Sequence, residues 1–416
     1  MLFDINNYNI ILAVITYFLL TVALFTIFKK FVVSYADPLI YHLIWIASNL
    51  TFLIIYFESN NVTSDFYIIF ISQLIYLVSI FFFFGRYLKR KNAVKVPYNY
   101  KNLSISKWQT IVAILFLCWL YSYGDFFLYS LTTTNFSDLF SFRFQDLQGR
   151  DPIMRVMNAS SIFLNFFLFY GIQNKIRITT CYFTIVIMLV IAVLSGGRSA
   201  VFNLIFSAGA YIVLYSRVLN QLKIKKINKL SILLIVVGSI FSITVSGFYA
   251  EEFSLLDGAT TMFNRIFASS DGLEYYFNYV DNNNFHTGFY EYFMSIFGFY
   301  LKSIFGIDYK NIGWQLIDLA SGTELTFAQG PNYTFMLQGI VINKFILPAY
   351  TVLVCWFVSR LRYLTVGNIV YTPFKFAILS ISFLIPVDLE YFVFMLLSIT
   401  VVYSLFVYPL MNVKKV

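Results

Sequence analysis

The chain has too little charge for a soluble protein. Only 12% of its 416 residues are Asp, Glu, Lys or Arg, whereas an ordinary soluble domain contains about 25%. Apolar residue types make up 59%, and the 49 Phe and 32 Tyr residues contribute much of that share. A soluble fold could not bury so many large apolar side chains, so we expect lipid to be the solvent for most of the chain. The composition predicts an all-α polytopic integral membrane protein.

Histidine and cysteine are also scarce. Two histidines, His42 and His286, are too few for a multi-histidine site, and we expect neither a metal nor another cofactor. The three cysteines lie inside apolar runs and indicate no disulfide framework: Cys118, Cys181 and Cys355. The sequence lacks the phosphate-binding loop, the dinucleotide-binding glycine motif and the zinc- and serine-hydrolase motifs. This argues against nucleotide-driven chemistry and against these hydrolase classes.

Long apolar runs are abundant. A membrane span needs about 20 mostly apolar residues, and we predict eleven spans: 8–28, 38–57, 66–84, 108–128, 156–172, 179–195, 199–216, 230–250, 334–357, 369–386 and 389–409. The run from 179 to 216 would form one helix of roughly 57 Å, far longer than the hydrocarbon layer. The two glycines in Ser195-Gly196-Gly197-Arg198-Ser199 permit a reversal there. We therefore predict a hairpin whose turn, 195–199, holds Arg198 at a membrane surface.

Basic residues predict the orientation of these spans. If the N-terminus is outside and the C-terminus inside, every short inner connection contains Lys or Arg, as the positive-inside rule requires. Every acidic residue except Asp37 then falls on or near the outer side. We predict one membrane domain, 1–416, with a first outer loop at 129–155 and a large outer loop at 251–333, between spans 8 and 9. Within the large loop, 288–306 is apolar but contains Glu291 and Lys302, which suits an interfacial or re-entrant helix.

Arginine dominates the basic residues of the predicted outer side. Three arginines lie in the first outer loop, one in the hairpin turn and one in the large loop: Arg143, Arg150, Arg155, Arg198 and Arg265. A guanidinium offers a planar fork of donors that matches phosphate. For most of these arginines a surface ion pair with a nearby carboxylate is an equally good interpretation. Arg198 has no acidic residue close to it in the sequence, so it is the best candidate for a lipid-linked phosphate or diphosphate site.

A general base that deprotonates a sugar hydroxyl would have to come from the outer side of the membrane, like the candidate arginines. Glu252 directly follows a predicted span, and Asp271 and Glu274 lie one helical turn apart, near Arg265. His286 is a further possibility, and the sequence does not choose among the four. Several outer aromatic residues are of the types that stack on sugar rings: Tyr275, Tyr276, Trp314 and Tyr333.

Lys344 is an unusual residue for a membrane span. An uncompensated lysine at mid-bilayer costs about 2.5–3.5 kcal/mol on the insertion scale. Either a broken or re-entrant stretch precedes a shorter span, or Lys344 faces the protein interior. Gly330-Pro331-Asn332 and Gly339 interrupt the helix pattern and favour the break.

Three short stretches resemble the Wzy family of O-antigen and related polysaccharide polymerases: LSGGRSAVF at 194–202, NRIFASSDGL at 264–273 and GPNYTFMLQG at 330–339. Through topology, the resemblance extends over most of the chain. It implies a metal-independent glycosyltransferase of the bacterial inner membrane, with its active site facing the periplasm. The growing chain is passed from its undecaprenyl diphosphate to the terminal sugar of an incoming lipid-linked repeat unit.

The resemblance also implies roles for the candidate residues. Arg198 and Arg265 would hold the diphosphate as it leaves and charge develops on it. Arginines of the first outer loop would assist them: Arg143, Arg150 and Arg155. One of three carboxylates would deprotonate the acceptor hydroxyl: Glu252, Asp271 or Glu274. The implied partners are the undecaprenyl-diphosphate-linked oligosaccharide, membrane lipid, and a chain-length regulator and flippase of the same pathway, with no nucleic acid.

Two other functions stay open at this point. An O-antigen ligase would share the architecture and the donor but use a lipid A core as acceptor, and it would be expected to have a prominent histidine in the large outer loop, where His286 is the only candidate. A flippase or transporter for the same lipid-linked unit should have charged residues along several spans. Here Lys344 and Lys375 are the only basic residues that fall within predicted spans, which favours the polymerase.

Overall fold

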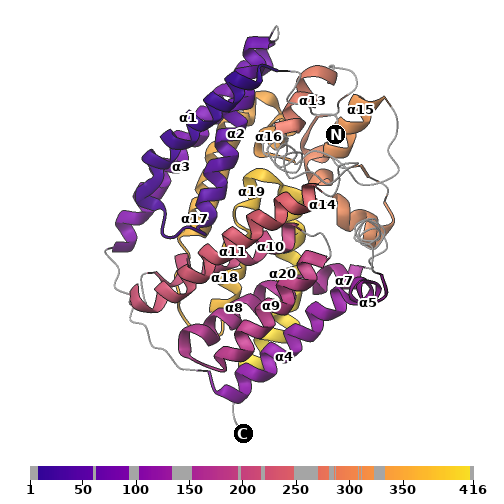
Figure 1. Ribbon diagram of the computed structural model, residues 1–416. Coiled ribbons are helices and arrows are strands. Elements are labelled where there is room, and N and C mark those ends of the chain that lie inside the picture. The colour runs from indigo at the N-terminus through magenta and orange to yellow at the C-terminus, as the bar shows by residue number, and fades with distance from the viewer. Residues whose placement is uncertain are drawn as a thin grey trace.

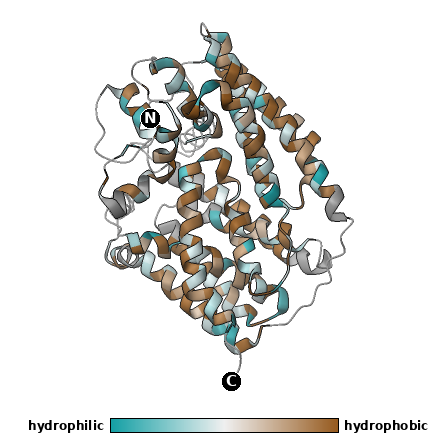
Figure 2. Cartoon of the chain, turned by 180° about the vertical axis from the view of Figure 1, so that it is seen from behind, coloured by the Kyte–Doolittle hydropathy of each residue, from teal (hydrophilic) through white to brown (hydrophobic). Residues whose placement is uncertain are grey.

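The computed structural model describes residues 8–59, 62–92, 103–133, 152–194, 198–216, 221–247, 270–280, 285, 287–307, 309–310, 312–322 and 333–412. These parts of the chain are helical and contain no strand (Figure 1). Among them, seven helices are long and apolar enough to cross a membrane, and four shorter apolar helices accompany them. Hydrophobic residues run along the lengths of the helices (Figure 2). The protein is therefore an all-helical, membrane-embedded chain, whereas the count of eleven spans and the N-out orientation stay predictions.

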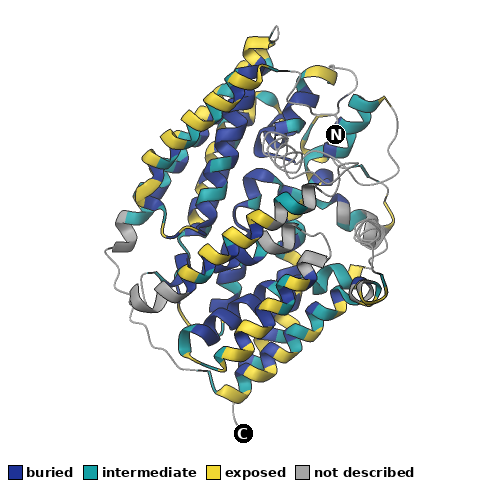
Figure 3. Cartoon of the chain, viewed as in Figure 1, coloured by how far each residue is buried: buried dark blue, intermediate teal, exposed yellow. Residues whose placement is uncertain are grey.

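The first three long helices form one side of the molecule. They are α1 (Ile10–Phe28), α2 (Pro38–Ser59) and α3 (Ser64–Asn92), with a short 3₁₀ turn, η2 (Lys29–Phe31), after α1. Helix α1 packs on α2, and α3 packs along α17 (Leu347–Arg362). Only 11% of the most apolar window of α1 is buried, against 78% for α2, and Figure 3 shows this contrast. Helix α1 thus presents apolar side chains to the surroundings, as a lipid-facing helix must.

The middle of the chain forms a second group of helices around α8 (Ser160–Asn174): α4 (Ile105–Ser122), α5 (Gly124–Thr132), α7 (Pro152–Met157), α9 (Ile178–Leu194), α10 (Arg198–Tyr215) and α11 (Gln221–Gly247). Helices α4, α9, α10 and α11 pack against α8. The indole N–H of Trp108 donates to the Phe167 carbonyl at 2.8 Å and joins α4 to α8. The predicted division of 179–216 into two helices is confirmed, because α9 ends at Leu194, α10 begins at Arg198, and the two pack together.

The last third of the chain contains shorter helices: α13 (Asp271–Tyr279), α14 (Phe289–Phe305), α15 (Ile312–Ser321), α16 (Phe335–Ile342), η4 (Lys344–Ile346), α18 (Thr372–Ile381), α19 (Leu384–Val387), α20 (Leu389–Val402), the π-helical η5 (Tyr403–Val407) and α21 (Tyr408–Asn412). The segment 288–306 is a helix, as predicted, and this helix, α14, packs on α16 and α20. Its relation to a membrane surface stays a prediction.

Three predicted spans are interrupted. The first, 334–357, breaks at Asn343, whose extended backbone separates α16 from η4 and whose side-chain oxygen accepts from the backbone N–H of Phe345. This side chain caps the next helical turn and so stabilises the break. The second, 108–128, divides at Tyr123, between α4 and α5. The third, 369–386, divides between α18 and α19. The break before α17 agrees with the sequence analysis, and the other two were missed.

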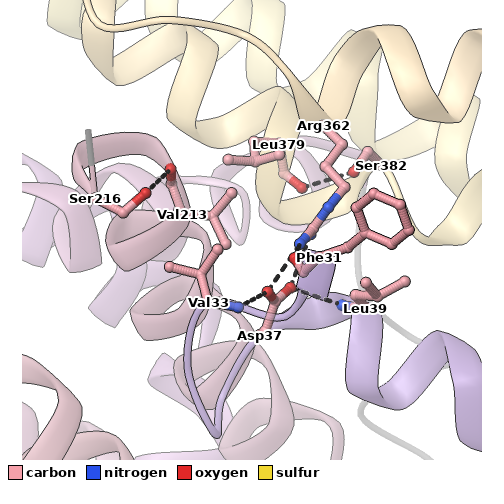
Figure 4. Close-up of polar contacts among 9 residues, drawn as sticks. All are labelled: Phe31, Val33, Asp37, Leu39, Val213, Ser216, Arg362, Leu379 and Ser382. Atoms are coloured by element: carbon pink, nitrogen blue, oxygen red, sulfur yellow. Dashed lines mark hydrogen bonds and ion pairs between the residues drawn. The ribbon is translucent and has the colours of Figure 1, made fainter. Parts of the chain in front are cut away.

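A buried ion pair joins the start of α2 to the end of α17 (Figure 4). Both guanidinium NH₂ groups of Arg362 donate to the carboxylate of Asp37 at 2.8 Å, and one of them also donates to the Phe31 carbonyl. The same carboxylate accepts from the backbone N–H groups of Val33 and Leu39 at 2.9 Å. Asp37, the one acidic residue that the sequence analysis expects on the inner side, therefore has a structural partner in Arg362.

Helix α10 approaches this ion pair closely at Gly209. A Cβ atom at Gly209 would lie only 1.7 Å from the backbone oxygen of Ala36. The missing side chain therefore lets the backbone that precedes Asp37 lie directly on α10. This contact connects the first group of helices to the second.

Candidate functional site

Two of the three candidate bases, Asp271 and Glu274, lie on α13, and this short helix is docked on α2. The hydroxyl of Ser270 donates to the Asn49 side chain at 2.5 Å, and that of Tyr56 donates to the Asn278 side chain at 2.9 Å. Both partners on α2 are buried. The two ends of α13 are thus fixed to a helix that is itself mostly enclosed by protein. The third candidate base, Glu252, lies outside the described residues.

Glu274 is a buried carboxylate. It is 6% exposed, and its Oε1 accepts a hydrogen bond of 2.6 Å from the hydroxyl of Tyr8, just before α1. No donor from the described part of the chain reaches its Oε2. Burial raises the pKa of Glu274, and the hydrogen bond from Tyr8 partly opposes that rise. An enclosed carboxylate with one unpaired oxygen has capacity for a further donor.

Asp271 is the first residue of α13, and its surroundings favour the neutral form of its carboxyl group. Part of its surface is accessible, yet the protein atoms packed around it raise its pKa to about 7. A hydrogen bond of 2.8 Å from the Gly272 backbone N–H opposes this rise, and the negative charge of Glu274 adds to it. A general base works best when its pKa lies near the operating pH. Of the candidate carboxylates in the described residues, Asp271 fits that requirement best.

A third carboxylate, Asp65, ties α13 to the break before α17. Its Oδ2 accepts from the Tyr276 hydroxyl and its Oδ1 from the Lys344 ammonium, both at 2.9 Å. Lys344 lies in η4, at the break between α16 and α17, which agrees with the favoured interpretation of a broken stretch before a shorter span. Lys375, the other lysine placed in a span, lies in the first turn of α18 and donates to the Thr365 carbonyl. Sequence analysis missed Asp65 and found only the unusual position of its partner.

The candidate arginines are only partly described. Arg198 is the first residue of α10, but its side chain lies outside the described part of the structure. Three others lie wholly outside the described residues: Arg143, Arg150 and Arg265. Arg155 lies on α7, half-buried, and α7 packs against α4 and α20. The convergence of all five arginines on one phosphate therefore stays a prediction.

A polar pocket lies between the helices that carry Arg155 and Arg198. Its lining comes from α4, the α7–α8 connection, α8, α9 and α10: Trp119, Tyr123, Asn158, Ser161, Asn165, Met188, Leu189, Asn203 and Leu204. Its free space is about 430 Å³, open mouth included. Asn158 follows Arg155 by three residues, and Asn203 follows Arg198 by five. We call this group of residues the asparagine pocket. Sequence analysis missed it, because polar side chains on three separate helices show their proximity only in the fold.

A chain of contacts through α3, α16 and α20 runs from α13 to the helix that carries Arg155. Lys344, just after α16, pairs with Asp65 beneath α13, whereas Tyr333, just before α16, accepts a long backbone hydrogen bond of 3.5 Å from Leu389. Leu389 begins α20, and α20 packs against α7. Figure 1 shows α13 and α15 at the upper right of the molecule and α5 and α7 lower down on the same right-hand side. The Asp37–Arg362 pair lies at the opposite end of α2 and α17.

Several other candidates have structural roles in the fold. Tyr275, Tyr276 and Tyr333 are buried, so the expectation that their rings stack on sugars is wrong. His42 is buried and its Nε2 lies 2.6 Å from the Tyr76 hydroxyl, within the helix core. His286 lies outside the described residues. Within the described residues, no three His, Cys, Asp or Glu side chains gather closely enough to hold a metal ion.

Comparisons with other proteins give no further guide to the function. The chain matches no protein-family model, no curated protein and no solved structure. Its function is therefore inferred from its own residues and their arrangement.

Proposed function

We propose that the protein is a polysaccharide polymerase of the bacterial inner membrane that joins undecaprenyl-diphosphate-linked oligosaccharide repeat units at the periplasmic face. The observation that carries this proposal is the placement of two kinds of group along one side of an apolar helical bundle. Carboxylates on α13, one with a pKa of about 7, lie on that side. Helix α7, with Arg155, lies on the same right-hand side in Figure 1 and is linked to α13 through contacts of α3, α16 and α20.

The proposed reaction needs a base and positively charged groups that bind the leaving diphosphate. The carboxylate of Asp271 takes the proton from the acceptor hydroxyl while that oxygen attacks the anomeric carbon of the growing chain. The bond from this carbon to the diphosphate breaks, and its electron pair stays with the undecaprenyl diphosphate. Arg198, Arg265 and one or more arginines of the first outer loop stabilise the negative charge as it develops. The diphosphate is already a good leaving group, so the transfer consumes no nucleotide.

The lipid tail of such a donor requires a path of hydrocarbon beside the site. Residues of α4 and α9 contribute to the lining of the asparagine pocket, and both helices also expose large apolar side chains: Leu117, Val186 and Val190. A polyprenyl chain lying along these side chains stays in the bilayer while its diphosphate reaches the helix ends. This arrangement supports a lipid-linked donor over a soluble sugar nucleotide.

The direct test is incubation of the purified protein with a lipid-linked repeat unit, followed by separation of the products by size. We expect a ladder of lipid-linked chains from the wild type and loss of the ladder from Asp271→Asn. Asp318→Asn is the matched control, because Asp318 lies on α15, packed beside α13, and pairs with Lys310 at 2.8 Å. The control should retain the ladder. A wild-type protein that makes no product longer than one repeat unit would refute the proposal.

Glycolipids from a strain that lacks the gene distinguish the polymerase from its two alternatives. Loss of a polymerase leaves lipid A cores capped with one repeat unit. Loss of a ligase leaves uncapped cores together with long lipid-linked chains, and loss of a flippase leaves neither product on the outer side. We expect the first pattern, and either of the others would reassign the function.

A further inference from the structure

The asparagine pocket has polar but uncharged chemistry. Among the described residues, its lining combines three amides, one serine hydroxyl and two aromatic rings with three aliphatic side chains, without an Asp, Glu, Lys or Arg. Asn158, Ser161 and Asn165 follow one another at spacings of three and four, which places them on one face of the α7–α8 segment. Asn203 faces them from α10 and Tyr123 from α4. Amides gathered between apolar helices are costly unless they find partners, so their convergence calls for a ligand.

Asn165 shows this need most directly. Its side chain is 2% exposed and lines the pocket, and its amide nitrogen lies 3.2 Å from the hydroxyl oxygen of Ser207 on α10. No group in the described residues pairs with its amide oxygen. If the amide is turned by half a rotation, the oxygen meets Ser207 and the nitrogen loses its partner instead. In either arrangement one polar atom of a buried amide is left unpaired beside the cavity.

We propose that the asparagine pocket binds the uncharged edge of one sugar of the lipid-linked oligosaccharide. The inference rests on the proposed polymerase function and assigns a substrate group to this part of the site. Amides pair with hydroxyl and acetamido groups, which offer both donors and acceptors, and the half-buried ring of Tyr123 covers the apolar face of a sugar ring. The described lining offers no cation to pair with a diphosphate, so the pocket suits an uncharged group better.

The size and position of the pocket fit an edge of a ring. The space that water-sized groups can occupy is about 30 Å³, room for about two water molecules, so the pocket takes a hydroxymethyl or acetamido arm of a sugar and not the whole ring. Asn203 lies five residues beyond Arg198 on α10, a rise of about 7.5 Å along the helix axis. A sugar held there has its linked diphosphate near the start of α10, where the sequence places the arginine.

Two lipids that differ only in the sugar test this inference: undecaprenyl diphosphate, and the undecaprenyl-diphosphate-linked repeat unit extracted from cells that lack this gene. Binding of each to the full-length protein in lipid nanodiscs is measured for the wild type, Asn203→Leu and Asn165→Leu. We expect both variants to weaken binding of the lipid-linked repeat unit by about tenfold, the usual effect of a lost buried hydrogen bond. Their affinity for undecaprenyl diphosphate should stay unchanged.

Controls separate a binding role from a purely structural one. Asn228→Leu changes a comparable amide on α11, outside the pocket, and should bind both lipids as the wild type does. Asn203 is only half-buried, so its variant should fold even if Asn165→Leu does not, and size-exclusion elution checks this. An equal loss of affinity for both lipids, or no loss for either, would overturn the inference. If the wild type binds the lipid-linked repeat unit more tightly than undecaprenyl diphosphate but makes no ladder, the polymerase function is refuted. The sugar-binding inference would then still stand.

Discussion

Lys344 and Asp65 stand 279 positions apart in the chain, and their ammonium and carboxylate groups lie 2.9 Å from each other. The other oxygen of Asp65 accepts from Tyr276 on α13. Lys344 precedes α17, and Arg362 near the end of α17 pairs with Asp37. Helix α17 is thus joined at both ends to the first three helices. At the Lys344 end, the carboxylate of Asp65 also binds α13, the helix that carries the candidate base Asp271.

The first prediction concerns this shared carboxylate. The Lys344 and Asp65 side chains are 37% and 21% exposed, so the ion pair itself contributes roughly 0.2–1 kcal/mol to the free energy of unfolding. Asp65→Asn should therefore shift the unfolding temperature only slightly. We expect it to slow ladder synthesis more than Lys344→Met does, because it also weakens the bond to Tyr276 that positions α13. Equal rates for the two variants would contradict a positioning role for Asp65.

The second prediction concerns the pH dependence of chain extension. Asp271, with its pKa raised to about 7, accepts a proton only when it is ionised. The rate of ladder synthesis should be constant above pH 8 and fall as the pH drops through about 7, because protonation removes the base. Asp271→Asn should lower the rate by roughly 10²–10⁴-fold. A wild-type rate that stays constant down to about pH 5 would exclude Asp271 as the base.

The third prediction separates the two carboxylates of α13. The negative charge of Glu274 is one cause of the raised pKa of Asp271. Glu274→Gln removes that charge, so the descending limb of the rate–pH profile should move to lower pH while the enzyme stays active. The measurement is the pH profile of the variant beside that of the wild type. If Glu274→Gln abolishes the ladder and Asp271→Asn keeps it, the base is Glu274.

The general architecture could be predicted from the sequence because it follows from local composition. Apolar runs of sufficient length predicted the long helices, and the glycines at 196 and 197 predicted the division between α9 and α10. Lys344 also indicated the break in the helix before α17, since a lysine at mid-bilayer is costly. Each of these inferences depends on residues that are neighbours in the chain.

The candidate site was less predictable, because its contacts join residues that are distant in the chain. Nothing near Asp65 in the sequence indicates that it binds both Lys344 and Tyr276. Tyr276 is of a residue type that stacks on sugar rings. Only the docking of α13 on α2 and α3 reveals that it is buried. The asparagine pocket escaped notice for the same reason, since single asparagines in apolar runs resemble ordinary helix contacts.

The fourth prediction concerns Arg198, the first residue of α10. Arg198→Ala should abolish chain extension without preventing membrane insertion, because the proposed diphosphate loses its guanidinium fork. Arg198→Lys should restore the ladder only in part, since an ammonium keeps the charge but not the planar pair of donors. The chain-length distribution of the polysaccharide from strains with verified expression measures both effects. Normal chain lengths from Arg198→Ala would remove this residue from the site.

The fifth prediction concerns stability at the opposite end of the bundle. The side chains of Arg362 and Asp37 are 7% and 0% exposed, and removal of one partner from a buried pair leaves an uncompensated charge that costs about 3–5 kcal/mol. Arg362→Met should therefore lower the unfolding temperature sharply, whereas Arg360→Met, two residues earlier on the exposed face of α17, should leave it nearly unchanged. The double variant Asp37→Asn with Arg362→Met should be more stable than Arg362→Met alone, because no unpaired charge remains. Fluorescence-detected thermal unfolding in detergent measures all three, and equal losses from Arg362→Met and Arg360→Met would show that the ion pair does not fix the position of α17.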